Sequence, residues 1–239
     1  MLSFLRSLFG RGPASDRSPS IESPTSYISA SPPQAPPTKP RPSPDDEAQA
    51  LEDLAFRLRA DIAAGFMDRE QIIEGAADYV ADQMDPVRAR AEAERLWPAL
   101  VTQHRAAQAE WPETTDCDRL DAAFAALEAR GVIARQNFSC CGNCGSYEIG
   151  DEIGAAQDAG RPAHGYAFYH MQDTDSAVEG GGVYLNYGAC AEGEDAALAV
   201  GAEIVAELEA HGLRTDWNGD WGKRIGVTLD WKRRSDYSS

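Results

Sequence analysis

Three of the five cysteines lie within five residues of one another, at Cys140, Cys141 and Cys144. Cys141 and Cys144 have the C-x-x-C spacing that lets two thiolates bind one metal ion or form a small disulfide. Cys140 adds a third sulfur beside them. The chemistry of this segment is therefore metal binding, thiol redox reactions, or no more than the packing of small free thiols in a tight turn.

The first interpretation is a zinc site. A closed tetrahedral zinc site takes four nitrogen or sulfur ligands, so the three thiolates need one more. The residues that could supply it are all distant from the cluster in sequence: Cys117, Cys190, His164 and His170. A second C-x-x-C or an H-x-x-x-H pair, which would complete a zinc motif, does not occur. The cofactor expected is thus zinc or none.

The second interpretation is a thiol-disulfide oxidoreductase or redox sensor, with Cys141 as nucleophile and Cys144 as resolving thiol. A strand, a C-x-x-C and a helix follow one another here, as in thioredoxin-like proteins, and a helix N-terminus lowers the pKa of a thiol. Glu148, Asp151 and Glu152 act against this interpretation, because nearby carboxylates raise a thiol pKa.

The elements around the cluster are predicted by a change from helical to alternating periodicity at Val132. We expect a strand before the cluster and a helix after it, then further strands, a helix and a turn: strands 132–138, 165–171, 183–188 and 225–231, helices 147–157 and 195–211, and an Asn-Gly turn within 214–223. The order β-α-β-β-α-β-β predicts a ferredoxin-like sheet with helices on one face. Residues 172–182 then form a solvated hairpin, and His170 is a core or edge histidine of its strand.

Helices are predicted before the sheet, over residues 47–130. Their limits are marked by capping residues: Asp68 with Gln71, Asp85 before Pro86, Thr115 with Asp118, and the helix-ending Gly65 and Gly131. Pro98 should bend or break one of them. The prediction is a single α+β domain over residues 47–234, with a helical part (47–130) and a sheet part (131–234). A tail, 235–239, follows a basic run, 232–234, that we expect to be solvated.

Residues 1–46 are predicted to be a disordered arm rich in proline and serine, because ten of the fourteen prolines lie in it. Its first twelve residues have one apolar face. They fit either a frayed terminus or a weak helix that contacts a membrane surface or a partner.

Charge excludes some classes of partner. The net charge is −17, and residues 47–239 account for −18 of it against +1 for the arm. So acidic a domain repels phosphate backbones, which excludes general nucleic-acid binding. No apolar run approaches the roughly 20 residues of a transmembrane helix. An odd number of cysteines favours a reducing compartment, so we expect a cytoplasmic protein. We also expect its partner to be another protein.

The sequence resembles an uncharacterised bacterial family that is catalogued as a domain of unknown function. The resemblance rests on three blocks, 115–124, 138–144 and 172–182, and on the shorter segments 217–219 and 223–227. The resemblance covers roughly residues 50–234 and implies no reaction or cofactor. We therefore predict an interaction or regulatory module with a thiol-rich, zinc-binding site. The enzyme class, as a thiol-disulfide oxidoreductase, is the alternative.

Overall fold

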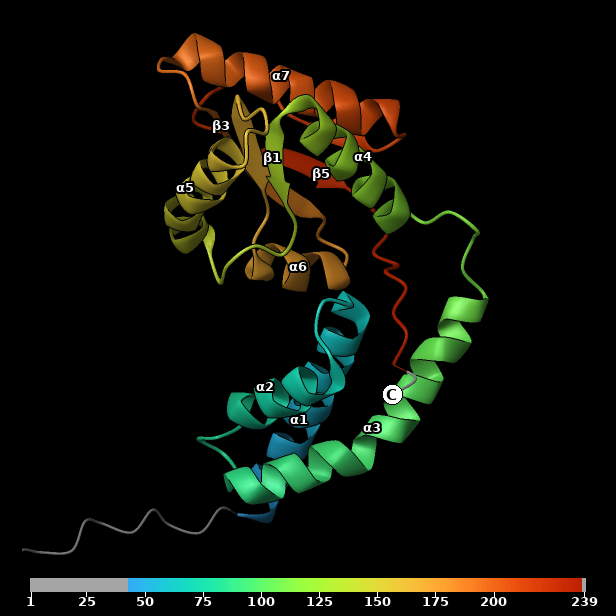
Figure 1. Cartoon of the computed structure of the whole chain (residues 1–239). Coiled ribbons are helices and arrows are strands. Elements are labelled where there is room, and N and C mark those ends of the chain that lie inside the picture. The colour runs from blue at the N-terminus through green and yellow to red at the C-terminus, as the bar shows by residue number, and fades with distance from the viewer. Residues whose placement is uncertain (1–42, 238–239) are drawn as a thin grey trace, which may run out of the picture. The chain divides into compact units, whose positions relative to one another are not determined.

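The structure is a computed structural model that describes residues 43–237. Nearly all of the predicted arm, including the apolar segment of residues 1–12, lies outside these residues. The described chain is a mixed α+β domain with seven helices and one five-stranded sheet (Figure 1). The predicted fold class, α+β, is confirmed at this level.

Three helices form the helical part and share one apolar core: α1 (Pro44–Ala64), α2 (Arg69–Tyr79) and α3 (Pro86–Ala109). Helix α1 begins at Pro44, within the last three residues of the predicted arm (1–46), because Ser43 and Asp46 form a capping box. Of the predicted bend or break at Pro98, the break is wrong, because α3 continues through this residue. Both Pro98 and Glu94, whose carbonyl loses its intrahelical partner, are exposed, so water can replace the missing hydrogen bond.

The sheet part contains the remaining elements: α4 (Asp116–Arg130), β1 (Val132–Arg135), α5 (Gly142–Asp158), β2 (Gly165–Phe168), α6 (Met171–Val178), β3 (Val183–Ala189), α7 (Glu194–Ala210), β4 (Arg214–Asp216) and β5 (Ile225–Thr228). The strand order is β1-β2-β3-β5-β4. β1 and β2 are parallel, and the other neighbours are antiparallel.

The strand order corrects the predicted ferredoxin-like topology. A split β-α-β unit has another strand between its two parallel strands, whereas here β1 pairs directly with β2, Val132 opposite Gly165. The helices also cover two faces rather than one. Val132 and Ala134 belong to the main core, to which α4 and α7 contribute, while Ile133 packs with Phe168 under α5 on the other side. A strand of four residues, buried on both faces, gives no alternating pattern from which this could be predicted.

Helix α6 is a second correction. The predicted strand 165–171 ends at Phe168, and the predicted hairpin contains a helix. His170 is the N-cap of α6, not a strand residue, and it forms a reciprocal capping box with Asp173. Asp173, Thr174 and Ala177 are buried, so one side of this segment belongs to the interior of the domain. Histidine is not among the residues that usually cap a helix, and the sequence therefore carried no recognisable signal.

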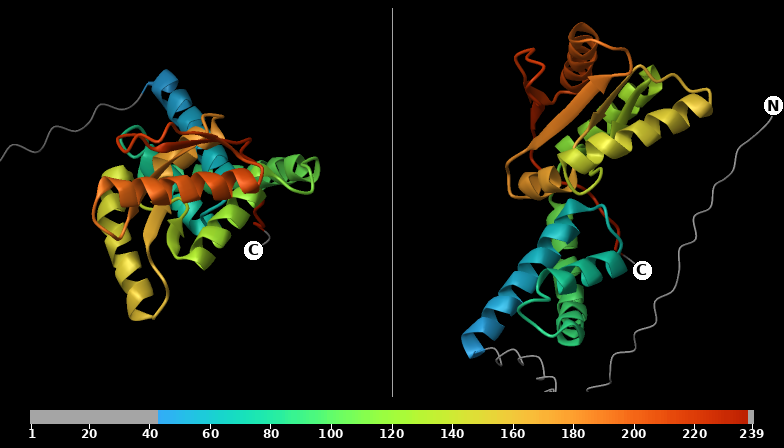
Figure 2. Two further views of the ribbon diagram at one scale, coloured as in Figure 1. Left: turned by 90° about the horizontal axis from the view of Figure 1, so that it is seen from above. Right: turned by 90° about the vertical axis from the view of Figure 1, so that its left-hand side faces the viewer.

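Residues 229–237, here called the C-terminal strap, connect the sheet part to the helical part (Figures 1 and 2). The Trp231 indole donates to the carbonyl of Ala63 at 3.0 Å, and the Tyr237 hydroxyl donates to that of Ile62 at 3.0 Å. Arg233 pairs with Asp121 and lies over the Phe66 ring. The predicted solvated basic run is thus wrong for Arg233, whose side chain is only 18% exposed.

Candidate functional site

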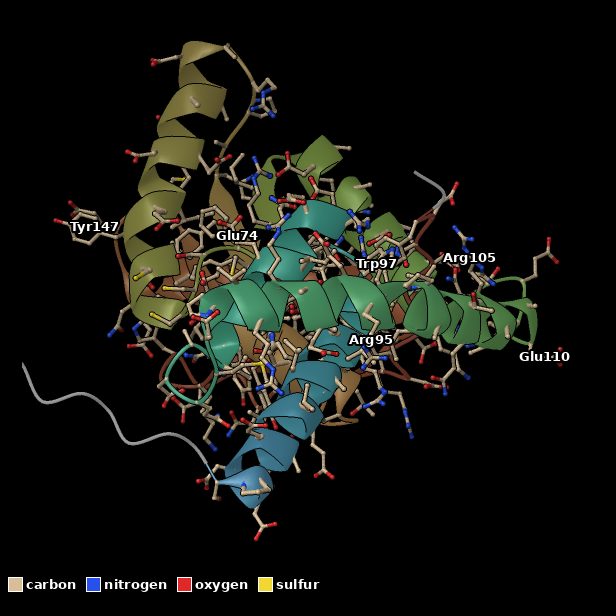
Figure 3. The ribbon with its side chains drawn as sticks, turned by 90° about the horizontal axis from the view of Figure 1, so that it is seen from below. Glu74, Arg95, Trp97, Arg105, Glu110 and Tyr147 are labelled. Atoms are coloured by element: carbon tan, nitrogen blue, oxygen red, sulfur yellow. The ribbon has the colours of Figure 1, made fainter. Side chains whose placement is uncertain are left out.

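The three clustered thiols meet at the N-terminus of α5. The Sγ atoms of Cys140, Cys141 and Cys144 all lie within 4.8 Å of one another, and among residues 43–237 they are the only group of three potential metal ligands this close. Cys141 is the N-cap residue of the helix. Cys140 is exposed and the other two are half-buried. Tyr147, one turn on, points away from the domain and is 89% exposed (Figure 3), so solvent reaches this end of α5.

The loop before the cluster has a constrained backbone. Asn137 and Ser139 have φ of 50° and 61°, the only non-glycine residues with positive φ among those the structure describes. Backbone hydrogen bonds hold the loop to the segment between β2 and α6: Phe138 N donates to Tyr169 O at 2.8 Å, and Met171 N donates to Ser139 O at 3.1 Å. Residues with a strained backbone persist only where their surroundings fix them. Here Asn137 and Ser139 determine the path of the chain from β1 to the cysteines.

Gly145 sets the distance between α5 and the sheet. A Cβ atom at this position would lie 2.4 Å from Cε2 of Phe168, a fully buried side chain of β2. Gly142, in the same turn, lies against the side chains of His170 and Asn186. The first turn of α5, which bears the cysteines, is therefore seated directly on the sheet.

The thiols differ in acidity. The pKa of Cys141 is lowered, chiefly because the backbone N–H of Cys144 and then its thiol donate hydrogen bonds to the Cys141 sulfur. The pKa of Cys144 is raised to about 11 by its hydrogen bonds to Cys140 and Cys141 and by their negative charge. Cys141 therefore ionises first, and Cys144 keeps its proton to stabilise that thiolate.

This difference predicts an order of alkylation in metal-free protein. Because the thiolate is the nucleophile, Cys141 should react with iodoacetamide at pH 7.5 roughly tenfold or more faster than Cys144. Raising the pH to 10 should reduce the difference between the two alkylation rates. Cys117, buried in α4 with its pKa raised to about 12 by burial, should stay unmodified until the protein unfolds. Peptide mass spectrometry measures each rate, and a Cys144 that reacts before Cys141 would contradict the assignment.

None of the four predicted fourth ligands belongs to the close thiol group. Cys117 is 1% exposed in the main core, and Cys190 is exposed after β3. His164 Nε2 lies 2.8 Å from Glu203 Oε2. His170 lies beside Gly142, but Asp173 contacts both of its ring nitrogens. The described residues thus supply three close thiols and no fourth ligand.

A partly buried ionic cluster that includes His170 was not foreseen from the sequence. Arg224 binds Asp173 in bidentate fashion, with Nη1 to Oδ2 at 3.0 Å and Nη2 to Oδ1 at 3.2 Å. The Asp173 N–H donates to Nδ1 of His170, and Nε2 of the same ring lies 3.1 Å from Asp173 Oδ2 and 3.2 Å from Arg224 Nη1. Burial lowers the pKa of His170, and Arg224 adds to this while Asp173 opposes it. Arg224 and Asp173 are 51 residues apart, so no local pattern marks the pair.

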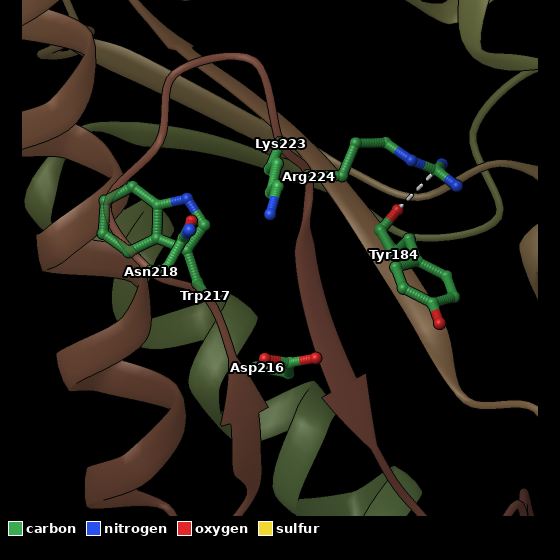
Figure 4. A pocket seen from close by; sticks show the side chains of 6 residues that line it. All are labelled: Tyr184, Asp216, Trp217, Asn218, Lys223 and Arg224. Atoms are coloured by element: carbon green, nitrogen blue, oxygen red, sulfur yellow. Dashed lines mark hydrogen bonds between the residues drawn. The ribbon is translucent and has the colours of Figure 1, made fainter.

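Two cavities lie on the α5 side of the sheet. Strand register places Tyr184, Asn186 and Phe168 on this side, and α5 covers only Phe168 among them. The larger cavity, of about 420 Å³, is lined by Tyr184, Asp216, Trp217, Asn218, Lys223 and Arg224 (Figure 4). The smaller, of about 270 Å³, shares Lys223 and Arg224 with it and reaches Ser146 of α5, two residues beyond Cys144.

No helix within residues 43–237 combines the length and the apolarity needed to cross a bilayer.

Comparison with known proteins identifies the family but not the activity. Residues 47–235 match the family described as Domain of unknown function (DUF6891), so the chain belongs to that family. Comparison with curated proteins and with solved structures gives no match. The family thus assigns no activity to the chain, and its function depends on the chemistry of the site.

Proposed function

We propose that this member of the family is a metal-thiolate module in which Cys140, Cys141 and Cys144 bind one zinc ion at the N-terminus of α5. The observation that carries the proposal is the gathering of three Sγ atoms within 4.8 Å. A zinc ion with bonds of about 2.3 Å to tetrahedral sulfurs separates those sulfurs by roughly 3.8 Å. The group needs only a small contraction to reach that spacing.

Electrostatics supports metal binding at this place. Thiolates are the ligand form, and the lowered pKa of Cys141 favours the loss of its proton. The partial positive charge of a helix N-terminus stabilises a group of thiolates. A metal ion would also remove the proton that Cys144 otherwise keeps, because coordination deprotonates a thiol outright.

The number of ligands favours an interaction or regulatory role. Three protein ligands leave one tetrahedral position for water or for a donor from another molecule. Because the cluster is partly exposed, a partner protein can reach that position. We propose that an incoming side chain completes the coordination. All five cysteines are free thiols, which supports a reducing compartment such as the cytoplasm.

The test is the metal content of the full chain purified without chelator. We expect about one zinc per chain, and cobalt in its place should show the absorption of tetrahedral thiolate coordination. Cys144→Ser should lose the metal. Cys190→Ser, which removes an exposed thiol outside the cluster, should keep it. A wild-type protein that holds no zinc after loading and dialysis would overturn the proposal.

A second candidate function rests on the opposed pKa shifts of Cys141 and Cys144. In a disulfide reductase, the Cys141 thiolate attacks a substrate disulfide, forms a mixed disulfide and releases one substrate thiolate. Cys144 then gives up its proton and attacks Cys141 Sγ, which forms the Cys141–Cys144 disulfide and releases the second substrate thiolate. Cys144→Ser would trap the mixed disulfide, whereas Cys190→Ser would not. Trapped adducts on a metal-free protein would establish this function in place of the first.

A further inference from the structure

The larger cavity on the α5 side of the sheet lies beside a row of residues that crosses three strands. Tyr184 of β3 pairs with Gly226 of β5, and Gly226 pairs with Asp216 of β4. Gly226 has no side chain, so the Tyr184 ring and the Asp216 stem approach each other above β5. A Cβ atom on Gly226 would lie 3.4 Å from Tyr184 Cε1 and 3.5 Å from Asp216 Cβ. This space of about 420 Å³, here called the Asp216 cavity, has the size of many small-ligand sites.

The first feature that points to a ligand is a pair of opposite charges. Asp216 and Lys223 both line the Asp216 cavity, and Figure 4 shows the ammonium end of Lys223 directed into the space on whose other side Asp216 lies. Within residues 43–237 neither side chain has an ion-pair partner. Arg224 differs, because Asp173 binds its guanidinium group. The cavity therefore presents one carboxylate and one ammonium group that no described residue neutralises.

The second feature is aromatic surface. Tyr184 is 46% exposed, and the Arg224 guanidinium lies 5.3 Å from the centroid of its ring, a cation–π contact that supports the ring. The Trp217 indole lines another side of the cavity (Figure 4) and packs edge-on against Tyr187. Both rings are thus held by neighbouring side chains, and an apolar group in the cavity would find a preformed surface.

The two features together restrict the ligand. A compound with a single charge would pair with one of Asp216 and Lys223 and be repelled by the other. A zwitterion whose ammonium and carboxylate groups are close together can pair with both. α-Amino acids have this structure, and an apolar side chain on such a compound would bury area against the aromatic rings.

We propose that the Asp216 cavity binds a free α-amino acid with an aromatic or aliphatic side chain. The ammonium group of the amino acid pairs with the Asp216 carboxylate, and its carboxylate pairs with Lys223 Nζ. Its side chain lies against Tyr184 and Trp217. This binding goes beyond the function proposed above, because the site is separate from the thiols and requires no metal.

The test is calorimetric titration of the full chain with phenylalanine and leucine, and with two derivatives that each lack one charge. Phenylalaninamide keeps the ammonium group without the carboxylate, and N-acetylphenylalanine keeps the carboxylate without the ammonium group. We expect saturable one-to-one binding of both amino acids, and binding weaker by roughly tenfold or more for both derivatives. Glycine measures how much the two charges contribute without a side chain.

Three variants assign the binding to the cavity. Lys223→Gln and Asp216→Asn each remove one charge at similar volume, and each should weaken the binding of phenylalanine roughly tenfold or more. Lys223→Gln should no longer distinguish phenylalanine from phenylalaninamide, and Asp216→Asn should no longer distinguish it from N-acetylphenylalanine. Arg214→Gln removes a charge from β4 outside the cavity and should change binding less than about twofold. Thermal melting verifies that each variant is folded.

Three results would overturn the proposal. One is the absence of saturable binding for both phenylalanine and leucine. Another is a derivative that binds wild-type protein as tightly as phenylalanine does, because the site would then recognise only one charge. The third is binding that Lys223→Gln and Asp216→Asn leave unchanged, which would place the amino acid elsewhere on the domain.

Discussion

Replacing Val227 by aspartate is expected to unfold the domain. Val227 is 3% exposed, belongs to the main core and pairs with Val183 on β3 and Thr215 on β4. A carboxylate there would lose its hydration without gaining a partner. Burying such a group costs several kcal/mol, comparable with the 5–15 kcal/mol of total stability typical of a domain.

The control is the next residue. Thr228 is exposed at the end of the same strand, with its side chain on the opposite face. Thr228→Asp should change stability by no more than about 0.5 kcal/mol. Circular dichroism during urea and thermal denaturation measures both variants. Equal damage from the two substitutions would show that β5 is buried on both faces.

Gly145→Ala is expected to destabilise the domain and to disturb the thiol cluster together. The added methyl group would lie 2.4 Å from the ring of Phe168, which is fully buried. Overpacking of this kind costs about 1–3 kcal/mol. Because Cys144 is the preceding residue, lifting this turn from the sheet should also weaken the proposed binding of zinc, by roughly tenfold or more.

The same substitution at Gly150 provides a matched control on the same helix. Gly150 has no atom within 4 Å of the added methyl group and is exposed. Gly150→Ala should stabilise α5 by about 0.5–1 kcal/mol, because alanine has the higher helix propensity. It should leave zinc binding unchanged. Opposite signs for the two variants in thermal melts are the expected result, and a Gly145→Ala protein as stable as wild type would contradict the packing argument.

Local features of the fold were predictable from the sequence. The capping boxes at Asp68 and Thr115 are both present, because a cap depends on residues three positions apart. The thiol cluster could be located for the same reason, since its members lie within five residues and one helix start brings their sulfurs together.

Features set by distant residues were not predictable. The strand order depends on pairing between short strands, and β1 and β2 have only four residues each. The bidentate contact of Arg224 with Asp173 forms only when the segment before β5 meets α6, 51 residues earlier in the chain. Nothing in the local sequence distinguishes these side chains from solvated ones.

The C-terminal strap has a consequence for the order of folding. Trp231 contacts a carbonyl 168 residues earlier in the chain, and Tyr237 contacts one 175 residues earlier. During synthesis α1 therefore emerges long before the segment that binds it. The three-helix core can assemble early from contacts between neighbours in sequence, but its junction with the sheet part closes last, after a slow search over a long loop. Until then Trp97, which packs edge-on against Tyr237, lacks one of the aromatic rings that cover it.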